Sequence, residues 1–137
     1  MHCLNTNVVI AVMKGGPRRL MERFEAELAR DAITLPAIVL FELQYGVAKS
    51  DRRRENEDRL ATFLRGPIAV LAFDGEDAGE AGDIRAVLKR AGTPIGPYDI
   101  LVAAQARRRG ATLVTANTRE FARVPGLRIE DWGGVGR

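Results

Sequence analysis

Five short apolar segments alternate with longer helical segments along the chain, and this alternation limits the possible folds more than any other feature. The apolar segments cover residues 2–5, 32–36, 68–74, 111–117 and 127–132. Helices between apolar strands join them as parallel neighbours, so the pattern predicts an α/β domain in three layers. We expect a central, mainly parallel sheet with helices on both faces, and 68–74 (IAVLAFD) as a central buried strand.

The segments between these strands carry helix signals. Leu20, Phe24 and Leu28 are spaced four residues apart within 15–31, which predicts an amphipathic helix. Residues 50–66 (SDRRRENEDRLATFLRG) predict a second helix, whose mixed charges form a solvated face.

The starts of two other helices are indicated by single residues. Thr6 or Asn7 has a side chain suited to the N-cap of a short helix after the first strand. Pro36 suits the first helical position of the segment PAIVLFELQYGVAKS. No linker or repeat interrupts the 137 residues, so we expect one domain over 1–137, with a frayed tail at 132–137.

Composition narrows the class of protein further. With 46% hydrophobic and 28% charged residues, the chain is an ordinary globular domain. Its net charge of +3, from 21 basic and 18 acidic residues, favours a polyanionic partner only mildly. Only 6% of the residues are aromatic, so we do not expect a surface built on stacked aromatic rings.

The single cysteine and the single histidine exclude other kinds of site. Cys3 has no second cysteine to pair with, and neither a thiolate cage nor a His-rich zinc site can form with His2 alone. We expect Cys3 to be a buried, inert thiol. No basic start leads into a long apolar run, and no run is long enough to span a membrane, so we expect a cytoplasmic protein.

Polar residues follow several of the predicted strands. Asn5 and Thr6 end the first strand, and Thr115 and Asn117 end the strand ATLVT. Asp99 begins a helix directly after the Gly-Pro loop at 96–97. Ligands of open parallel sheets bind beyond the carboxyl ends of the strands, so we expect these side chains to border a site.

Glu42 is the least expected carboxylate in the chain. It lies between Phe41 and Leu43 in a helix that is apolar on nearly every face, which is costly without a cation or hydrogen bonds. Its same-face neighbour Gly46 is small enough to leave space beside it. The alternative is that Glu42 reaches solvent at an edge.

Two further features have structural alternatives. Asp99 could simply complement a helix dipole, as acidic residues in a first turn do. Arg107, Arg108 and Arg109 precede Gly110, as expected of a helix C-terminus, and phosphate binding is the less favoured reading. Taken together, Asn5, Glu42 and Asp99 offer only oxygen ligands, which suit Mg²⁺ or Mn²⁺ and are typical of phosphoryl-transfer sites.

Four stretches resemble a known family: LNTNVVI, LPAIVLFELQYGV, GTPIGPYDILVAAQA and LVTANTREFARVPGLRIEDW. Together they look like a PIN-domain ribonuclease, closest to the VapC-type toxins of bacterial toxin–antitoxin pairs. The resemblance implies an endoribonuclease that cleaves RNA phosphodiester bonds with Mg²⁺ or Mn²⁺. It implies a metal site at residue 5, Glu42 and Asp99, a catalytic polar residue at Asn117, and Glu120 close by.

The resemblance also implies partners and supporting residues. VapC-like proteins are usually homodimers, are held inactive by a VapB-type antitoxin that binds near the site, and cut structured RNA such as transfer or ribosomal RNA. Thr6 and Thr115 are candidates for orienting the carboxylates, although capping and strand-end turns explain them equally well.

The chain departs from the family at Asn5, where the family has Asp. Asn keeps one carbonyl oxygen but no charge, and a unit charge about 4 Å from another is worth roughly 4 kcal/mol at an effective dielectric of 20. We therefore expect weakened metal binding. The Asn is either natural or a substitution made to express a toxic enzyme, and the intact remainder of the pattern favours the second.

Two rival functions follow from the same residues. The chain could be an inactive module that binds RNA or only its antitoxin, which a natural Asn5 would favour. A flavodoxin-like nucleotide-binding domain shares the layered design but needs a glycine-rich loop after the first strand, and NTNVV contains no glycine.

Overall fold

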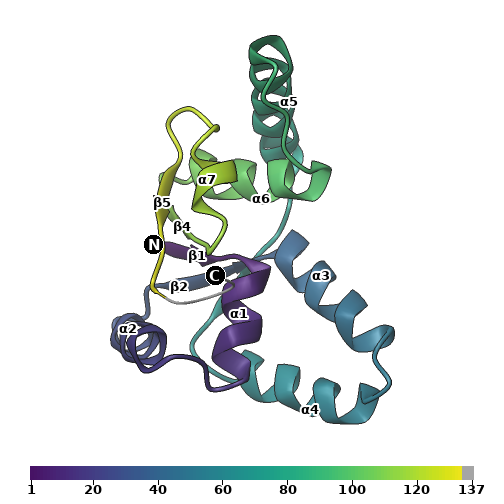
Figure 1. Cartoon of the computed structure of the whole chain (residues 1–137), viewed down its shortest axis with the longest axis vertical. Coiled ribbons are helices and arrows are strands. Elements are labelled where there is room, and N and C mark those ends of the chain that lie inside the picture. The colour runs from purple at the N-terminus through teal and green to yellow at the C-terminus, as the bar shows by residue number, and fades with distance from the viewer. Residues whose placement is uncertain (134–137) are drawn as a thin grey trace.

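The fold is built on one five-stranded sheet whose neighbouring strands are all parallel. The computed structural model describes residues 1–133. The strands follow the order β3-β2-β1-β4-β5 (Figure 1). They are β1 (His2–Leu4), β2 (Ile33–Pro36), β3 (Ala69–Leu71), β4 (Thr112–Val114) and β5 (Arg128–Glu130). The predicted α/β class and parallel sheet are confirmed.

Helices lie on both sides of this sheet and are connected as the alternation predicted. In Figure 1, α1, α3 and α4 lie together at the lower right, and α5 packs on α6 and stands out at the top. No helix among residues 1–133 is long and apolar enough to cross a membrane. The helices are α1 (Thr6–Met13), α2 (Arg18–Ala29), α3 (Ala37–Ala48), α4 (Arg53–Leu64), α5 (Gly75–Ala91), α6 (Pro97–Arg108) and α7 (Thr118–Phe121).

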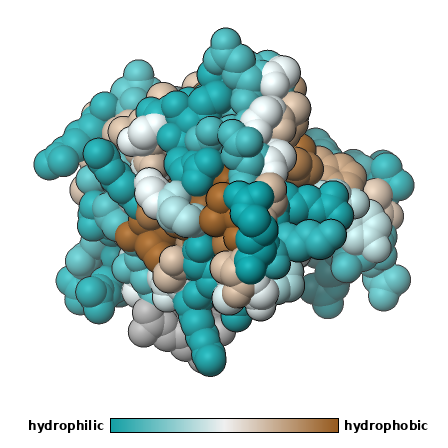
Figure 2. Space-filling model, turned by 90° about the horizontal axis from the view of Figure 1, so that it is seen from above, coloured by the Kyte–Doolittle hydropathy of each residue, from teal (hydrophilic) through white to brown (hydrophobic). Residues whose placement is uncertain are grey.

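The core surrounds the three central strands. Leu4, Leu35 and Leu113, from β1, β2 and β4, are fully buried. Cys3 is buried beside them as expected, with its Sγ 3.3 Å from Thr34 Oγ1, and burial raises the pKa of its thiol. Figure 2 shows the molecule from above, where hydrophilic side chains cover most of the face and hydrophobic residues show mainly in the hollows between them.

The prediction of a central strand at 68–74 is wrong. Only Ala69–Leu71 form β3, and this strand pairs with β2 alone, at the edge of the sheet. Val70 is 46% exposed. Apolar composition indicates a strand, but the order of strands depends on where each connection returns to the sheet.

Two predicted helix starts shift by one residue or more. Asn5, and not Thr6 or Asn7, is the N-cap of α1, because its Oδ1 accepts a hydrogen bond from the amide of Thr6 at 2.9 Å. Pro36 is the last residue of β2 and the N-cap of α3, so that helix begins at Ala37.

The expected fraying at 132–137 does not hold for the first two of these residues. Trp132 is only 3% exposed, its indole donates to Glu130 at 3.1 Å, and the guanidinium of Arg23 lies 5.2 Å from its ring centroid. Gly133 donates its amide to Asp131. Residues 134–137 lie outside the described residues.

The arginine triplet at the end of α6 binds α5. Arg107 pairs with Glu80 at 2.9 Å, and both Arg108 and Arg109 pair with Asp77, at 2.6 and 2.9 Å. Arg108 also pairs with Asp74 and Glu76. The triplet lies at the helix C-terminus as expected, but its ion pairs with α5 account for it, and phosphate binding is not needed to explain it.

Asp77 is the centre of this network and is fully buried. Burial by itself would raise the pKa of Asp77, but hydrogen bonds from Arg109, Arg108 and the amide of Asp74 hold it well below its usual range. The carboxylate also closes a capping box with Asp74 at the start of α5. One ionised side chain thus attaches α5 to α6.

We predict that Asp77→Asn lowers the free energy of unfolding by about 3 kcal/mol, because it leaves two guanidinium groups without their buried partner. Since the pKa is lowered in the folded state, this stabilisation is present above about pH 4 and is lost as the pH falls. Urea denaturation at pH 7 and pH 3 measures both effects.

The matched control is Glu76→Gln, because Glu76 pairs with the same Arg108 but its side chain is 79% exposed. Its loss should stay within about 0.5 kcal/mol. Equal losses for the two variants would contradict the central role of Asp77.

Candidate active site

The polar residues predicted to border a site meet where the strand order reverses. From β1 the chain builds β2 and β3 on one side, and β4 and β5 lie on the other. Such a reversal leaves a crevice beyond the carboxyl ends of the two neighbouring strands. Leu4 ends β1 and Val114 ends β4, and the amide of Asn5 donates to the carbonyl of Val114 at 2.9 Å.

Asn5 and Thr115 are joined at this point by their side chains. Asn5 Nδ2 donates to Thr115 Oγ1 at 3.0 Å, and Asn5 Oδ1 accepts from the amide of Thr6, so both ends of the Asn5 amide bind the protein. Thr115 is fully buried and also accepts from the amide of Asn117 at 3.0 Å. One hydroxyl therefore positions two of the predicted site residues.

Glu42 is directed toward the same crevice. Thr6 Oγ1 donates to Glu42 Oε1 at 2.9 Å, which joins the start of α1 to the middle of α3. The half-buried Glu42 also lines a hollow of about 190 Å³ with Gly46, and a Cβ at Gly46 would meet no atom within 4 Å. The expectation that Gly46 leaves space is confirmed, and Thr6 meets the hydrogen-bonding need of Glu42.

Asp99 and Glu120 complete an acidic cluster. Asp99 lies in the first turn of α6, and burial, followed by the negative charges of Glu120 and Glu42, raises the pKa of Asp99 to about 6. Glu120 accepts from Asn117 Nδ2 and, at 3.3 Å, from the amide of Gly96. A helix-dipole role would instead favour the ionised form, so Asp99 is more than a helix-capping residue.

The cluster has oxygen donors of the kind that suit a hard dication. Its donors are carboxylate and amide oxygens, and a cation would relieve the repulsion that raises the pKa of Asp99. Within residues 1–133, however, no three His, Cys, Asp or Glu side chains are arranged as a complete metal-holding group. Asn5, at the end of β1, offers an amide oxygen and no charge.

Asn7 is a member of this region that the sequence did not indicate. Its Oδ1 accepts from the amide of Ala116 at 3.3 Å, so it holds the segment after β4 and does not cap α1. From the sequence, Asn7 was only a candidate N-cap of α1, so nothing marked it as part of this region.

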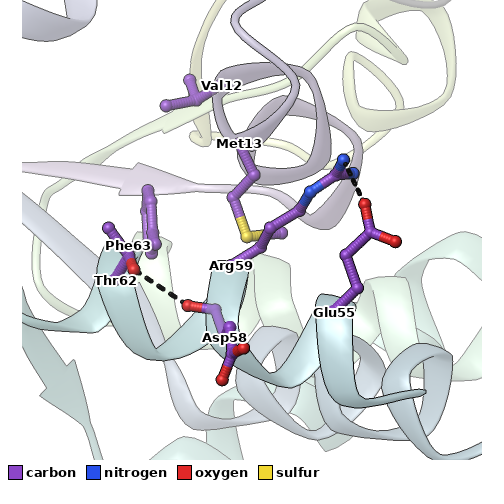
Figure 3. Close-up of a pocket in the computed structure, with 7 residues that line it drawn as sticks. All are labelled: Val12, Met13, Glu55, Asp58, Arg59, Thr62 and Phe63. Carbon is purple, nitrogen blue, oxygen red and sulfur yellow. Dashed lines mark hydrogen bonds and ion pairs between the residues drawn. The ribbon is translucent and has the colours of Figure 1, made fainter. Parts of the chain in front are cut away.

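A second hollow, which shares the lining residues Met13 and Arg59 with the one beside Glu42, lies between α1 and α4. It has a volume of about 470 Å³, and Figure 3 shows Met13 and Phe63 among the residues that line it. Two of its charged residues, Arg59 and Glu55, form an ion pair at 3.1 Å. We assign no catalytic role to this hollow.

Comparison with known proteins agrees with the geometry. Residues 2–127 match the PIN domain family. The chain is 43% identical over 129 residues to the tRNA(fMet)-specific endonuclease VapC of Salmonella typhimurium, which covers 94% of this chain and 96% of the relative. It is 34% identical to ribonuclease VapC2 of Rickettsia felis, over 96% of this chain and 97% of the relative.

Solved structures give the same result. A crystal structure of VapBC2 from Rickettsia felis, bound to a DNA fragment from its promoter, matches with a TM-score of 0.90 and 33% identity over 96% of this chain and 98% of the other. DNA-bound VapBC from Salmonella typhimurium matches with a TM-score of 0.89 and 41% identity, with the same coverage.

We predict that Asp99→Asn stabilises the metal-free protein at neutral pH. Because the pKa of about 6 in the folded state exceeds the ordinary 3.8, the stabilisation from Asp99 is complete below pH 3.8 and is lost as the pH rises through 6. That loss amounts to at most about 3 kcal/mol. Urea denaturation with a chelator, at pH 4.5 and 7.5, should show Asp99→Asn gaining on the unaltered chain at the higher pH.

Asp83→Asn, at an exposed position of α5, is the matched control. It should show no comparable gain between pH 4.5 and 7.5. If the Asp99→Asn and unaltered chains kept a constant difference in stability across this range, the carboxylate cluster would not be repulsive as described.

Proposed function

The chain belongs to the PIN domain family, and from this premise we propose that it is an endoribonuclease toxin of the VapC type, impaired by the Asn at position 5. The observation that carries the proposal is the convergence of Glu42, Asp99 and Glu120 on the crevice where Asn5 and Thr115 meet. PIN-domain nucleases generally use divalent metal ions, and we infer Mg²⁺ or Mn²⁺ from the oxygen ligands.

Each residue has a distinct role in this proposal. Residue 5, Glu42 and Asp99 hold the ion, which when bound supplies an activated water and neutralises charge on the phosphate. Thr6 orients Glu42 through its hydroxyl. Asn117 donates to Glu120, whose charge acts on Asp99, and in this proposal Asn117 faces the RNA backbone.

Thr115 lets position 5 accept either Asn or Asp. It accepts a hydrogen bond from the Asn5 amide, and its hydroxyl can instead donate to a carboxylate of nearly the same shape. An Asp at this position would therefore need no change in the backbone. We favour an introduced substitution over a natural one, since every other contact of the site is in place.

The relatives indicate the substrate and the partners. The Salmonella relative is named for tRNA(fMet), so we infer a structured RNA of this class as substrate. The matched structures are VapBC complexes, so we infer a VapB-type antitoxin as partner. The resemblance to VapC-type toxins implies a homodimer. The activity implies a cytoplasmic location.

We predict that Asn5→Asp increases Mn²⁺-dependent cleavage of tRNA(fMet) by about a hundredfold or more. The restored charge strengthens ion binding by an amount of the order of the roughly 4 kcal/mol Coulomb term. Gel analysis of cleavage against Mn²⁺ and Mg²⁺ concentration measures the effect, with the double variant Asn5→Asp/Glu42→Gln as an inactive control.

An absence of added, metal-dependent cleavage in Asn5→Asp would contradict the nuclease proposal. The alternative, a catalytically inactive module that binds RNA or the antitoxin, would then be preferred, most strongly if the native gene also encodes Asn5. Sequencing that gene separates the two origins of the Asn.

A second prediction concerns the antitoxin. The hollow beside Glu42 is lined by apolar residues of α1 and α3, with Lys14, Asn56 and Arg59 also in its lining, and it could take an apolar side chain of a partner near the site. Gly46→Leu should fill it without harming the fold, because the Cβ position is open, and should weaken binding of the cognate VapB-type antitoxin at least tenfold. Gly46→Ala is the control, and calorimetry is the measurement. If both variants bound the antitoxin as tightly as the unaltered chain does, the antitoxin would bind elsewhere.

A further inference from the structure

Three aromatic side chains are exposed although the chain has few aromatic residues. Phe41, Tyr45 and Tyr98 are 48%, 59% and 50% exposed, and they include both tyrosines of the chain. Most of the other aromatic rings are buried, as large apolar side chains usually are. Low aromatic content suggested that no stacking surface exists, but the content does not reveal where the rings lie.

These rings form a continuous line with one lysine. The ring centroids of Phe41 and Tyr98 are 5.4 Å apart at an interplanar angle of 63°, and Lys49 Nζ lies 5.0 Å from the centroid of the Tyr45 ring. Phe41 and Tyr45 lie on α3, and Lys49 is the C-cap of this helix with αR backbone angles. The three are spaced four apart and therefore share one face. We call Tyr98, Phe41, Tyr45 and Lys49 the aromatic stripe.

The aromatic stripe begins directly beside the acidic cluster. Phe41 precedes Glu42 on α3, and Tyr98 precedes Asp99 on α6. Helices α3 and α6 thus bring the rings of Phe41 and Tyr98 together. The residue after each ring is a carboxylate, and the charge of Glu42 acts on Asp99. A base stacked on these two rings would therefore lie next to Glu42 and Asp99.

Positive charge accompanies the rings. Lys49 ends the stripe, and a hollow of about 660 Å³ beside Tyr98 is lined in part by Arg85 and Lys89. Exposed rings with cations at both ends match the bases and phosphates of a single strand, whereas the carboxylates alone would repel it. An edge-on pair also leaves ring faces open for a base.

We propose that the aromatic stripe stacks unpaired bases of the RNA and so positions the adjacent phosphate at the acidic cluster. The inference rests on the proposed function, because it assigns the part of the RNA that binds: a single-stranded stretch, such as a loop. Stacking on a ring is tolerant of base identity and changes affinity roughly tenfold per base. Phe41 and Tyr98 act as positioning residues for the cleavage step.

The test compares two probes in the presence of a chelator, so that nothing is cleaved. One is a fluorescein-labelled 12-nucleotide oligouridylate, and the other is the same sugar–phosphate backbone without bases. With the unaltered chain, removal of the bases should weaken binding tenfold or more. In the double variant Phe41→Leu/Tyr98→Leu, which keeps apolar side chains, the same removal should change affinity less than threefold.

Three controls make the result specific. Tyr98→Phe should keep the dependence on bases, and Val70→Ala, which alters an exposed apolar residue on β3, should also keep it. The dependence on bases reports stacking and is not changed by the charge or the fold alone. Light scattering on the same samples reports self-association.

Several results would overturn the proposal. These are an equal effect of base removal in the unaltered chain and the double variant, no detectable binding of the oligouridylate, or loss of self-association in the variant with its base dependence unchanged. The last result would assign the surface to a second copy of the chain.

Failure of the proposed function gives a different pattern. Absence of cleavage by Asn5→Asp, with base dependence intact in the unaltered chain, would remove the nuclease proposal and leave the stacking surface. Cleavage that stays intact while base removal has no effect would remove only the stacking surface.

Discussion

The contact between the ends of β1 and β4 is the constraint on which the rest of the site depends. Asn5 bonds to Val114 through its backbone and to Thr115 through its side chain, at the one place where the strand order reverses. Because Asn5 also caps α1, the same contact sets the position of Thr6, which holds Glu42. Thr115 in turn positions Asn117 and, through it, Glu120.

Carboxylates serve opposite purposes in two parts of this molecule. Asp77 is fully buried, but guanidinium groups lower its pKa. Its ion pairs with Arg108 and Arg109 therefore stabilise the contact of α5 with α6. Asp99 instead lies near Glu120 and Glu42, and burial together with these carboxylates raises its pKa. Groups that repel one another destabilise the fold, and such strain is expected where a site is built to receive a cation.

Several features of the fold and the site could be predicted from residue types. The alternation of apolar and helical segments indicated the parallel sheet. The oxygen-bearing side chains of Asn5, Glu42 and Asp99 indicated that a site lies at one end of this sheet. The edge position of β3, the capping role of Asn5 and the burial of Trp132 could not be predicted, because each depends on which segment returns beside which. The same limit applied to the exposed rings of Phe41 and Tyr98.

The sequence by itself determined the spacing of the apolar residues, the approximate ends of helices and strands, and the chemistry of the oxygen ligands, since these depend on neighbours within one or two turns. It thereby also determined that residue 5 is an uncharged Asn. Only the tertiary structure decided that Glu42 and Asp99 are close enough to shift a pKa, and that Arg108 and Arg109 bind Asp77. Those contacts join residues more than thirty positions apart, and their partners are chosen by the packing of whole helices on the sheet.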